Sequence, residues 1–256
     1  MRKAWMATTT LLVALTVSGC VIVVGDDDAK MNYSERSVEG YRVLDRDGDY
    51  TRLGGDINLR GRIGGDLSLV SGDVDADQLD VGGDVSLAAG DVNFSGRVGG
   101  DASIAGGDVD WHADVDDELS IASGDLDVSG RILGEASLAA GDMTLEANFE
   151  DGLTAQAGGI YLAGSVRGEL TLISADKLRN RHRDRDASFG RIELAGTIQD
   201  GGQICARSVA FASTADISGT LRVWAEDDPD IARGANTGNL VFEARNGRDC
   251  DDILDR

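Results

Sequence analysis

Apolar residues alternate with small or polar residues along most of this chain, in short runs of three to five residues. Residues 85–87 (Val-Ser-Leu) and 92–94 (Val-Asn-Phe) are two such runs. An alternation with a period of two indicates β-strands that bury one face. A Gly-Asp or Gly-Arg pair ends each run, so the pattern predicts about three turns in every repeat.

The runs recur in a fixed register between residues 49 and 178, with steps of 17 residues and a single step of 18. The unit reads apolar-Gly-Gly-Asp-apolar-Ser-apolar-Ala-x-Gly-Asp-apolar-x-apolar-x-Gly-Arg. A repeat of this kind is typical of a solenoid. Two largely acidic columns and one apolar column share the period: Asp66, Asp84, Asp101, Glu118, Glu135, Gly152, Glu169; Asp73, Asp91, Asp108, Asp125, Asp142, Gly159, Asp176; and Ile63, Val81, Val98, Val115, Ile132, Phe149, Val166.

This repeat predicts an all-β chain folded as a single-stranded parallel β-helix, with about 17 residues and three short strands per turn. A hairpin meander would give no reason for a fixed period, whereas in a coil each strand pairs in parallel with its copy one turn later, about 4.8 Å away. Glycine is expected at the corners. Two further inward ladders are expected: Leu67, Val85, Ala102, Leu119, Ala136, Leu153, Leu170 on one face, and Val74, Val92, Val109, Leu126, Met143, Ile160 on another.

The period also divides the chain into segments. With 5 % aromatic residues and a single proline in 256 residues, one elongated body with a thin aliphatic core is expected. The predicted organisation is a lipoprotein signal peptide at 1–19, a lipidated tether and N-terminal cap at 20–48, regular β-helix repeats at 49–178, a basic loop insertion at 179–189, degenerate coils at 190–225 and a C-terminal cap or tail at 226–256.

The first twenty residues look like a targeting segment. A basic pair, Arg2-Lys3, precedes an apolar core at 11–15 that is too short to span a bilayer. The sequence Val-Ser-Gly-Cys at 17–20 resembles a bacterial lipobox, which implies cleavage before Cys20 and a lipid on that cysteine. The alternative is an ordinary signal peptide with a chance cysteine. By analogy with enterobacterial sorting, Val21 in place of Asp favours the outer membrane, facing the periplasm.

Two cysteines remain, Cys205 and Cys250. In an oxidising compartment they are expected to form one disulfide that ties the C-terminal tail onto the last coils. Such a cap would block one stacking end of the coil. Two free thiols or a metal pair are the alternatives.

The net charge is −22, and it becomes −24 once Arg2 and Lys3 are removed with the signal segment. So acidic a surface disfavours nucleic acid and favours cations or basic partners. Stacked carboxylates repel, and either backbone N–H groups at the Gly-Asp corners or weakly bound divalent cations could compensate. The corner interpretation is preferred. The candidate cation ligands are Asp73, Asp91, Asp108, Asp125 and Asp142.

Catalytic motifs are hard to find in this sequence. His112 and His182 lie outside any nucleophile or zinc motif, and we expect no cofactor and no enzymatic activity. A polysaccharide lyase would need an acid-and-base cluster near residues 177–187, where Arg181 and Arg183 lie. That basic run is otherwise expected to be a solvated loop, or else a docking site for an acidic partner.

The glycine-punctuated units at 81–87 (Val-Gly-Gly-Asp-Val-Ser-Leu) and 98–104 (Val-Gly-Gly-Asp-Ala-Ser-Ile) resemble those of the bactofilin family of polymer-forming β-helices. The resemblance covers residues 49–178 and implies a scaffold without an enzymatic site that associates end to end. The Ser-Gly-Asp units at 71–73 and 123–125 are similar to those of head-GIN putative adhesins, a β-helical group found among lipoproteins.

These features favour a structural, scaffolding lipoprotein of the cell envelope that is either monomeric or self-associating through its coil ends. The alternative is a surface adhesin or glycan-binding module that uses one face of the coil. Such a face would need exposed aromatic side chains, and the candidates are Trp111 and Tyr161. Because Trp111 shares a column with Phe94, Val128 and Leu145, we expect it to be buried, which favours scaffolding.

Overall fold

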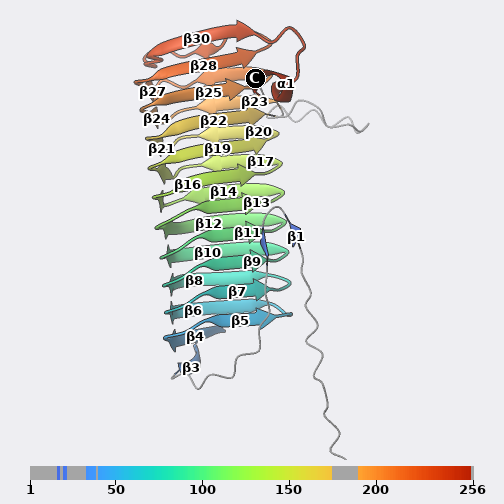
Figure 1. Cartoon of the computed structure of the whole chain (residues 1–256), viewed down its shortest axis with the longest axis vertical. Coiled ribbons are helices and arrows are strands. Elements are labelled where there is room, and N and C mark those ends of the chain that lie inside the picture. The colour runs from blue at the N-terminus through green and yellow to red at the C-terminus, as the bar shows by residue number, and fades with distance from the viewer. Residues whose placement is uncertain (1–15, 18–19, 22–32, 39, 175–189, 255–256) are drawn as a thin grey trace, which may run out of the picture.

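The computed structural model describes residues 16–17, 20–21, 33–38, 40–174 and 190–254. It is 62 % strand and 2 % helix, and it forms a parallel β-solenoid of about 11 turns that recur roughly every 17 residues (Figure 1). The predicted fold is therefore confirmed. The parallel register follows the sequence period, since Val92 pairs with Val109 and Val109 pairs with Leu126.

The first face of the solenoid is an 11-stranded sheet with one strand from each turn. Its inward positions are filled by the expected Leu67 ladder, which is buried throughout the regular repeats. The strands are β5 (Tyr50–Leu53), β7 (Leu67–Val70), β9 (Val85–Ala88), β11 (Ala102–Ala105), β13 (Leu119–Ala122), β16 (Glu135–Ala139), β19 (Gly152–Ala157), β22 (Glu169–Ser174), β25 (Gly201–Cys205), β28 (Thr220–Ala225) and β30 (Asn239–Ala244).

The second and third faces are separate only in the C-terminal half. There the second face contains β14 (Asp125–Ser129), β17 (Asp142–Leu145), β20 (Gly159–Leu162), β23 (Arg191–Leu194), β26 (Ser208–Phe211) and β29 (Asp230–Ile231). The third face contains β15 (Arg131–Ile132), β18 (Asn148–Phe149), β21 (Ser165–Val166), β24 (Thr197–Ile198) and β27 (Asp216–Ile217). In the N-terminal half each pair is one longer strand that continues round the corner: β6 (Ile57–Ile63), β8 (Val74–Val81), β10 (Asp91–Val98) and β12 (Asp108–Val115).

A bulge in β8 explains the single 18-residue step in the sequence. Ala76 pairs with Phe94 and Leu79 pairs with Gly96, so two residues of β8 face one residue of β10. One of the two is Gln78, which has a positive φ of 52°. Its backbone N–H donates to the Ser95 hydroxyl at 2.9 Å. The extra residue is thus absorbed at a corner and the inward register is kept.

The core is a thin stack of aliphatic ladders with one aromatic pair. Phe94 and Trp111 stack one turn apart with ring centroids 4.5 Å apart and planes inclined by 12°. Both side chains are fully buried, so the expectation that Trp111 lies inside is confirmed. Each inward residue contacts its copies in the adjacent turns, and stability therefore depends mainly on neighbouring turns.

At the N-terminal end, β3 (Tyr33–Val38) folds back antiparallel on β4 (Tyr41–Arg46), which pairs in parallel with β6. Gly40 makes the reversal with a φ of 86°. This hairpin covers the edge of β4, and β4 is already part of the coil although it lies within the segment at 20–48 that was expected to be a tether and cap. Further upstream, β1 (Thr16–Val17) pairs with β2 (Cys20–Val21).

The period is interrupted by one long insertion in the C-terminal half, and the last turns lengthen to 19 or 20 residues. Ile192 takes the position above Ile160, so the register resumes after 32 residues instead of 17. The predicted basic insertion at 179–189, with His182, lies outside the described residues. Beyond it the solenoid continues past the expected limit of 225 to β30, and the short helix α1 (Cys250–Leu254) follows.

Candidate functional site

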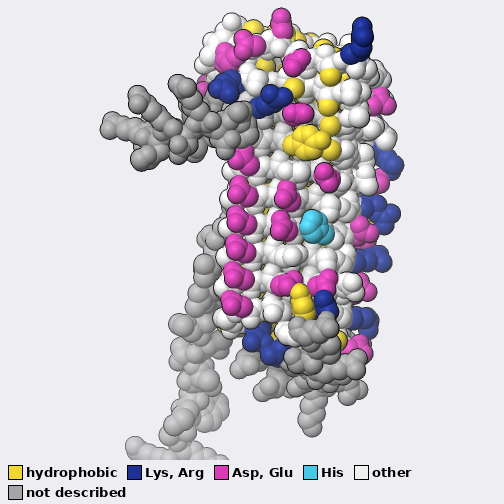
Figure 2. All heavy atoms as spheres, turned by 180° about the vertical axis from the view of Figure 1, so that it is seen from behind, with side chains coloured by type: hydrophobic (Ala, Val, Ile, Leu, Met, Phe, Trp, Pro, Cys, Tyr) yellow, Lys and Arg dark blue, Asp and Glu magenta, His cyan; other side chains and the backbone are white. Residues whose placement is uncertain are grey.

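Two rows of acidic side chains run along the solenoid, one before the strands of the first face and one after them; Figure 2 shows an acidic row along one edge of the solenoid. The first row is held by backbone hydrogen bonds between turns. The Asp66 carboxylate accepts from the N–H of Asp84 at 3.0 Å, and the Asp84 carboxylate accepts from the N–H of Asp101 at 3.0 Å. The corner interpretation therefore applies to this row, with the donor supplied by the following turn.

The second row contains the candidate cation ligands. Asp91, Asp108, Asp125 and Asp142 lie in register on successive strands, and the Asp73 carboxylate accepts from the N–H of Asp91 at 3.2 Å. Parallel pairing spaces their backbones about 4.8 Å apart. Across the part of the chain that the structure describes, no three His, Cys, Asp or Glu side chains converge on a point that could hold a metal ion. A row of carboxylates alone does not make a metal centre.

The first row gives a test of what holds these carboxylates. We expect Asp84→Ala to lower the free energy of unfolding by about 1 kcal/mol, because the N–H of Asp101 loses its acceptor. Asp84→Asn keeps an acceptor oxygen and removes one of several like charges, so we expect a change below about 0.5 kcal/mol. Chemical denaturation followed by circular dichroism measures both. Equal losses in the two variants would contradict the hydrogen-bond explanation.

Ion pairs also form between arginine and acidic side chains of neighbouring turns. Arg60 pairs with Asp77, Arg97 with Asp116 and Arg167 with Glu150. The hydrogen bond that Arg97 donates to the Asp116 carboxylate raises the pKa of the Arg97 guanidinium. These pairs partly offset the acidic rows, and exposed pairs of this kind contribute little individually.

Near the N-terminal end, Tyr41 donates its hydroxyl to the Asp75 carboxylate, and the Arg60 guanidinium lies 4.0 Å from the centre of the Tyr41 ring. The hydrogen bond with Asp75 is the main reason that the pKa of Tyr41 is raised. This cluster joins three successive turns, since Tyr41 lies in β4, Arg60 in β6 and Asp75 in β8.

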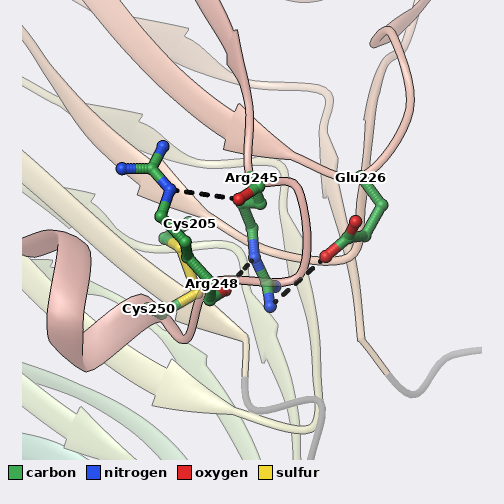
Figure 3. The surroundings of a disulfide bond; sticks show 5 residues. All are labelled: Cys205, Glu226, Arg245, Arg248 and Cys250. Atoms are coloured by element: carbon green, nitrogen blue, oxygen red, sulfur yellow. Dashed lines mark hydrogen bonds and ion pairs between the residues drawn. A yellow bond between two sulfur atoms is a disulfide. The ribbon is translucent and has the colours of Figure 1, made fainter.

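The disulfide joins Cys205 and Cys250, with Cα atoms 5.6 Å apart, and closes a separation of 45 residues (Figure 3). Beside it the Arg245 side chain is buried and 1 % exposed. Its Nε donates to the carbonyl oxygen of Arg248 at 3.0 Å, and its guanidinium lies 3.6 Å from a Glu226 carboxylate oxygen. These contacts fix the turn that redirects the chain from β30 to α1.

This tail lies on the flank of the solenoid and leaves its end uncovered, which corrects the expectation of a blocking cap (Figure 1). Cys205 belongs to β25, two strands below β30, and it shares an outward column with Ile173 and Trp224. The α1 residues Ile253 and Leu254 pack on this column with the disulfide. The outward apolar column supplies the hydrophobic surface that holds the helix there.

The C-terminal end is consequently open. Among the described residues β30 pairs only with β28 and β29 only with β26, so each has one unpaired edge. Ile231 aligns with the buried Phe211 one turn earlier, yet its side chain is 47 % exposed because no turn follows. Leu240 and Phe242 are partly buried against the same core. At this end the inward apolar columns therefore have no following turn to cover them, and the last strands have unpaired edges.

Two outward side chains distinguish the second face. Tyr161 is 38 % exposed, next to a hollow of about 390 Å³. A ring nitrogen of the exposed His112 lies 2.7 Å from the Ser129 hydroxyl. Of the two aromatic candidates for a binding face, only Tyr161 is accessible.

Some of the predictions concern residues that the structure does not describe. The signal segment, the side chain of Cys20 and the basic run with Arg181 and Arg183 lie outside the described side chains. Within the described ranges, no helix is long and apolar enough to cross a membrane.

Comparisons with protein-family models, with curated proteins and with solved structures find no significant match. The features of the solenoid that bear on its function are its acidic rows, its open end and the hollow beside Tyr161.

Proposed function

We propose that this chain is a non-enzymatic structural lipoprotein of the bacterial cell envelope, anchored through a lipid on Cys20 to the periplasmic side of the outer membrane. Its solenoid is a rigid rod that joins a second copy at the C-terminal end. The observation that carries the proposal is the open C-terminal end. Exposed strand edges are usually covered or protected in monomeric proteins. An unpaired edge beside an apolar core that is exposed at the end of the solenoid is therefore a template for pairing with another chain.

The two ends of the rod differ, and this limits the assembly. At the N-terminal end the β3 hairpin covers the edge of β4 and only β5 keeps an unpaired edge among the described residues, whereas at the C-terminal end β29 and β30 both keep one. A contact between two identical C-terminal ends is isologous and closes at two copies. The expected assembly is a rod of double length, with β30 of each copy antiparallel to the other.

Fixing the tail on the flank supports this arrangement. The Cys205–Cys250 disulfide and the buried Arg245 hold the last residues beside β25, away from the end. In the proposed assembly the tail is fixed to the side of the solenoid. It therefore leaves the contact surface at the end accessible while it stabilises the last turns. A disulfide also suits the oxidising periplasm.

A charged residue introduced at the C-terminal end of the solenoid tests the proposed pairing of two copies. We expect Ile231→Lys to abolish double-length rods, because pairing two such ends would bury two ammonium groups in an apolar contact. The full chain, purified in detergent, is examined by sedimentation equilibrium and negative-stain electron microscopy across a concentration series. The matched control is Leu133→Lys, which places the same charge on an exposed apolar residue of the flank, 39 % exposed, and should leave pairing unchanged.

Single rods at every concentration of the unmodified chain would overturn the proposed self-association. Long filaments would show instead that the N-terminal end also joins, and would contradict the closed pair. Equal loss of pairing in both variants would point to lateral contacts between rods.

A further inference from the structure

A glycine interrupts the acidic row on the second face, beside a hollow. Along β14, β17, β20 and β23 the outward column reads Asp125, Asp142, Gly159 and Arg191, so the acidic row ends at a residue without a side chain and resumes with the opposite charge. The hollow has a volume of about 390 Å³. It is lined by Asp142, Met143, Thr144, Gly159, Ile160, Tyr161, Arg191 and Glu193.

Strand register places Tyr161 beside this gap. Tyr161 lies two residues beyond Gly159 on β20, on the same side of the sheet, with Thr144 in the turn before and Glu193 in the turn after. The Arg191 guanidinium is 3.1 Å from the Glu193 carboxylate, which holds both groups near the ring. An exposed aromatic ring is thus bordered by hydrogen-bonding groups on the neighbouring strands. Figure 2 shows this face, where an apolar patch lies above the acidic rows.

We propose that this hollow binds a neutral oligosaccharide. An exposed aromatic ring offers an apolar face that can stack on the C–H groups of a pyranose. The Asp142 and Glu193 carboxylates accept hydrogen bonds from sugar hydroxyls, and the Arg191 guanidinium donates them. Asp142 and Arg191 lie two turns apart, so their backbones are about 10 Å apart, a span that accommodates one sugar ring with its hydroxyls.

Charge selects the class of saccharide. The hollow carries two carboxylates and one guanidinium, and the chain around it has a net charge of −22. A polyanionic glycan would be repelled by the adjoining row of Asp residues. A neutral chain would bind along the face without this penalty, and the shallow site predicts weak affinity, with a Kd of about 1 mM or somewhat below.

The test is titration of the full chain with N-acetylchitotetraose, followed by calorimetry, in a detergent without a sugar headgroup so that the detergent cannot compete. We expect Tyr161→Ala to weaken binding at least tenfold, because the stacking ring is lost. Tyr161→Phe keeps the ring and should remain within about threefold of the unmodified chain. Leu133→Ala, which removes an exposed apolar side chain elsewhere on the rod, is the matched control and should bind normally.

Three results would overturn the proposal: no binding of N-acetylchitotetraose at 10-fold above the expected Kd, unchanged binding in Tyr161→Ala, or tighter binding of tetragalacturonate than of the neutral tetramer. Because Tyr161 is exposed, its replacement should leave the circular dichroism spectrum and the thermal midpoint unchanged. That control separates a lost ligand contact from a lost fold. The result is also independent of pairing between rods, since Ile231 is several turns away.

Discussion

Replacing Trp111 with alanine is expected to lower the free energy of unfolding by about 3–5 kcal/mol. Trp111 is the largest fully buried side chain, and its ring stacks on Phe94 in the preceding turn. In a core made of single-residue ladders, few neighbours can move into the cavity without leaving their own register. Denaturant unfolding followed by far-ultraviolet circular dichroism measures the loss.

The informative control is Trp111→Phe. The indole Nε1–H is buried and has no hydrogen-bond partner within the described structure, so the phenyl ring loses volume but also removes an unsatisfied donor. Both effects are of order 1 kcal/mol and opposite in sign, and we expect the variant to remain within about 1.5 kcal/mol of the unmodified chain. A loss as large as that of the alanine variant would mean that the indole makes a contact beyond packing.

Gly168→Ala should destabilise the solenoid by at least about 3 kcal/mol. A Cβ at Gly168 would overlap the carbonyl oxygen of Asp151 in the preceding turn. That oxygen belongs to the backbone, so relief requires a shift of one turn against the next, and such a shift disturbs the ladder hydrogen bonds on both sides. Thermal unfolding of the full chain would show the effect as a lower midpoint.

Gly152→Ala is the matched control for Gly168→Ala. Its added Cβ would meet the Glu169 carbonyl oxygen at 3.3 Å, a tight but tolerable contact. The equivalent positions one turn before and after carry Glu135 and Glu169, so this corner accepts side chains. We expect a change within about 1 kcal/mol. A comparable loss in both variants would show that any side chain at these corners is harmful, whatever its contact.

The 17-residue period was sufficient to predict the fold because several columns of residues repeat in the same register. Columns such as Leu67–Val85–Ala102 repeat in every turn, so a lapse such as Gly152 does not obscure the register. The continuous strands of the N-terminal half could not be predicted in the same way. The residue type at the corner does not decide whether pairing is interrupted, since Gly96 lies within the continuous strand β10 with a φ of 134° and Gly130 lies between the separate strands β14 and β15 with a φ of 111°.

Prediction of the candidate sites was less complete. The pairing of Cys205 with Cys250 followed from their number, but the place of the tail did not, because it depends on Ile173 and Trp224 meeting on one outward column. The buried Arg245 carried no signal in the sequence. The hollow did carry one: Gly159 breaks the acidic column that Asp142 precedes, and only the structure shows that the gap lies beside an exposed Tyr161.

The stacking of about 11 turns has a consequence for distance. Each turn adds about 4.8 Å, so the rod spans about 50 Å from β4 to β30. In a chain fastened to a membrane at Cys20, that length would set how far the open end stands from the bilayer. Insertion or loss of one 17-residue unit would change this height in a single fixed increment and leave both ends intact. In such a chain the number of repeats in the sequence would determine the length of the rod between the anchored end and the open end.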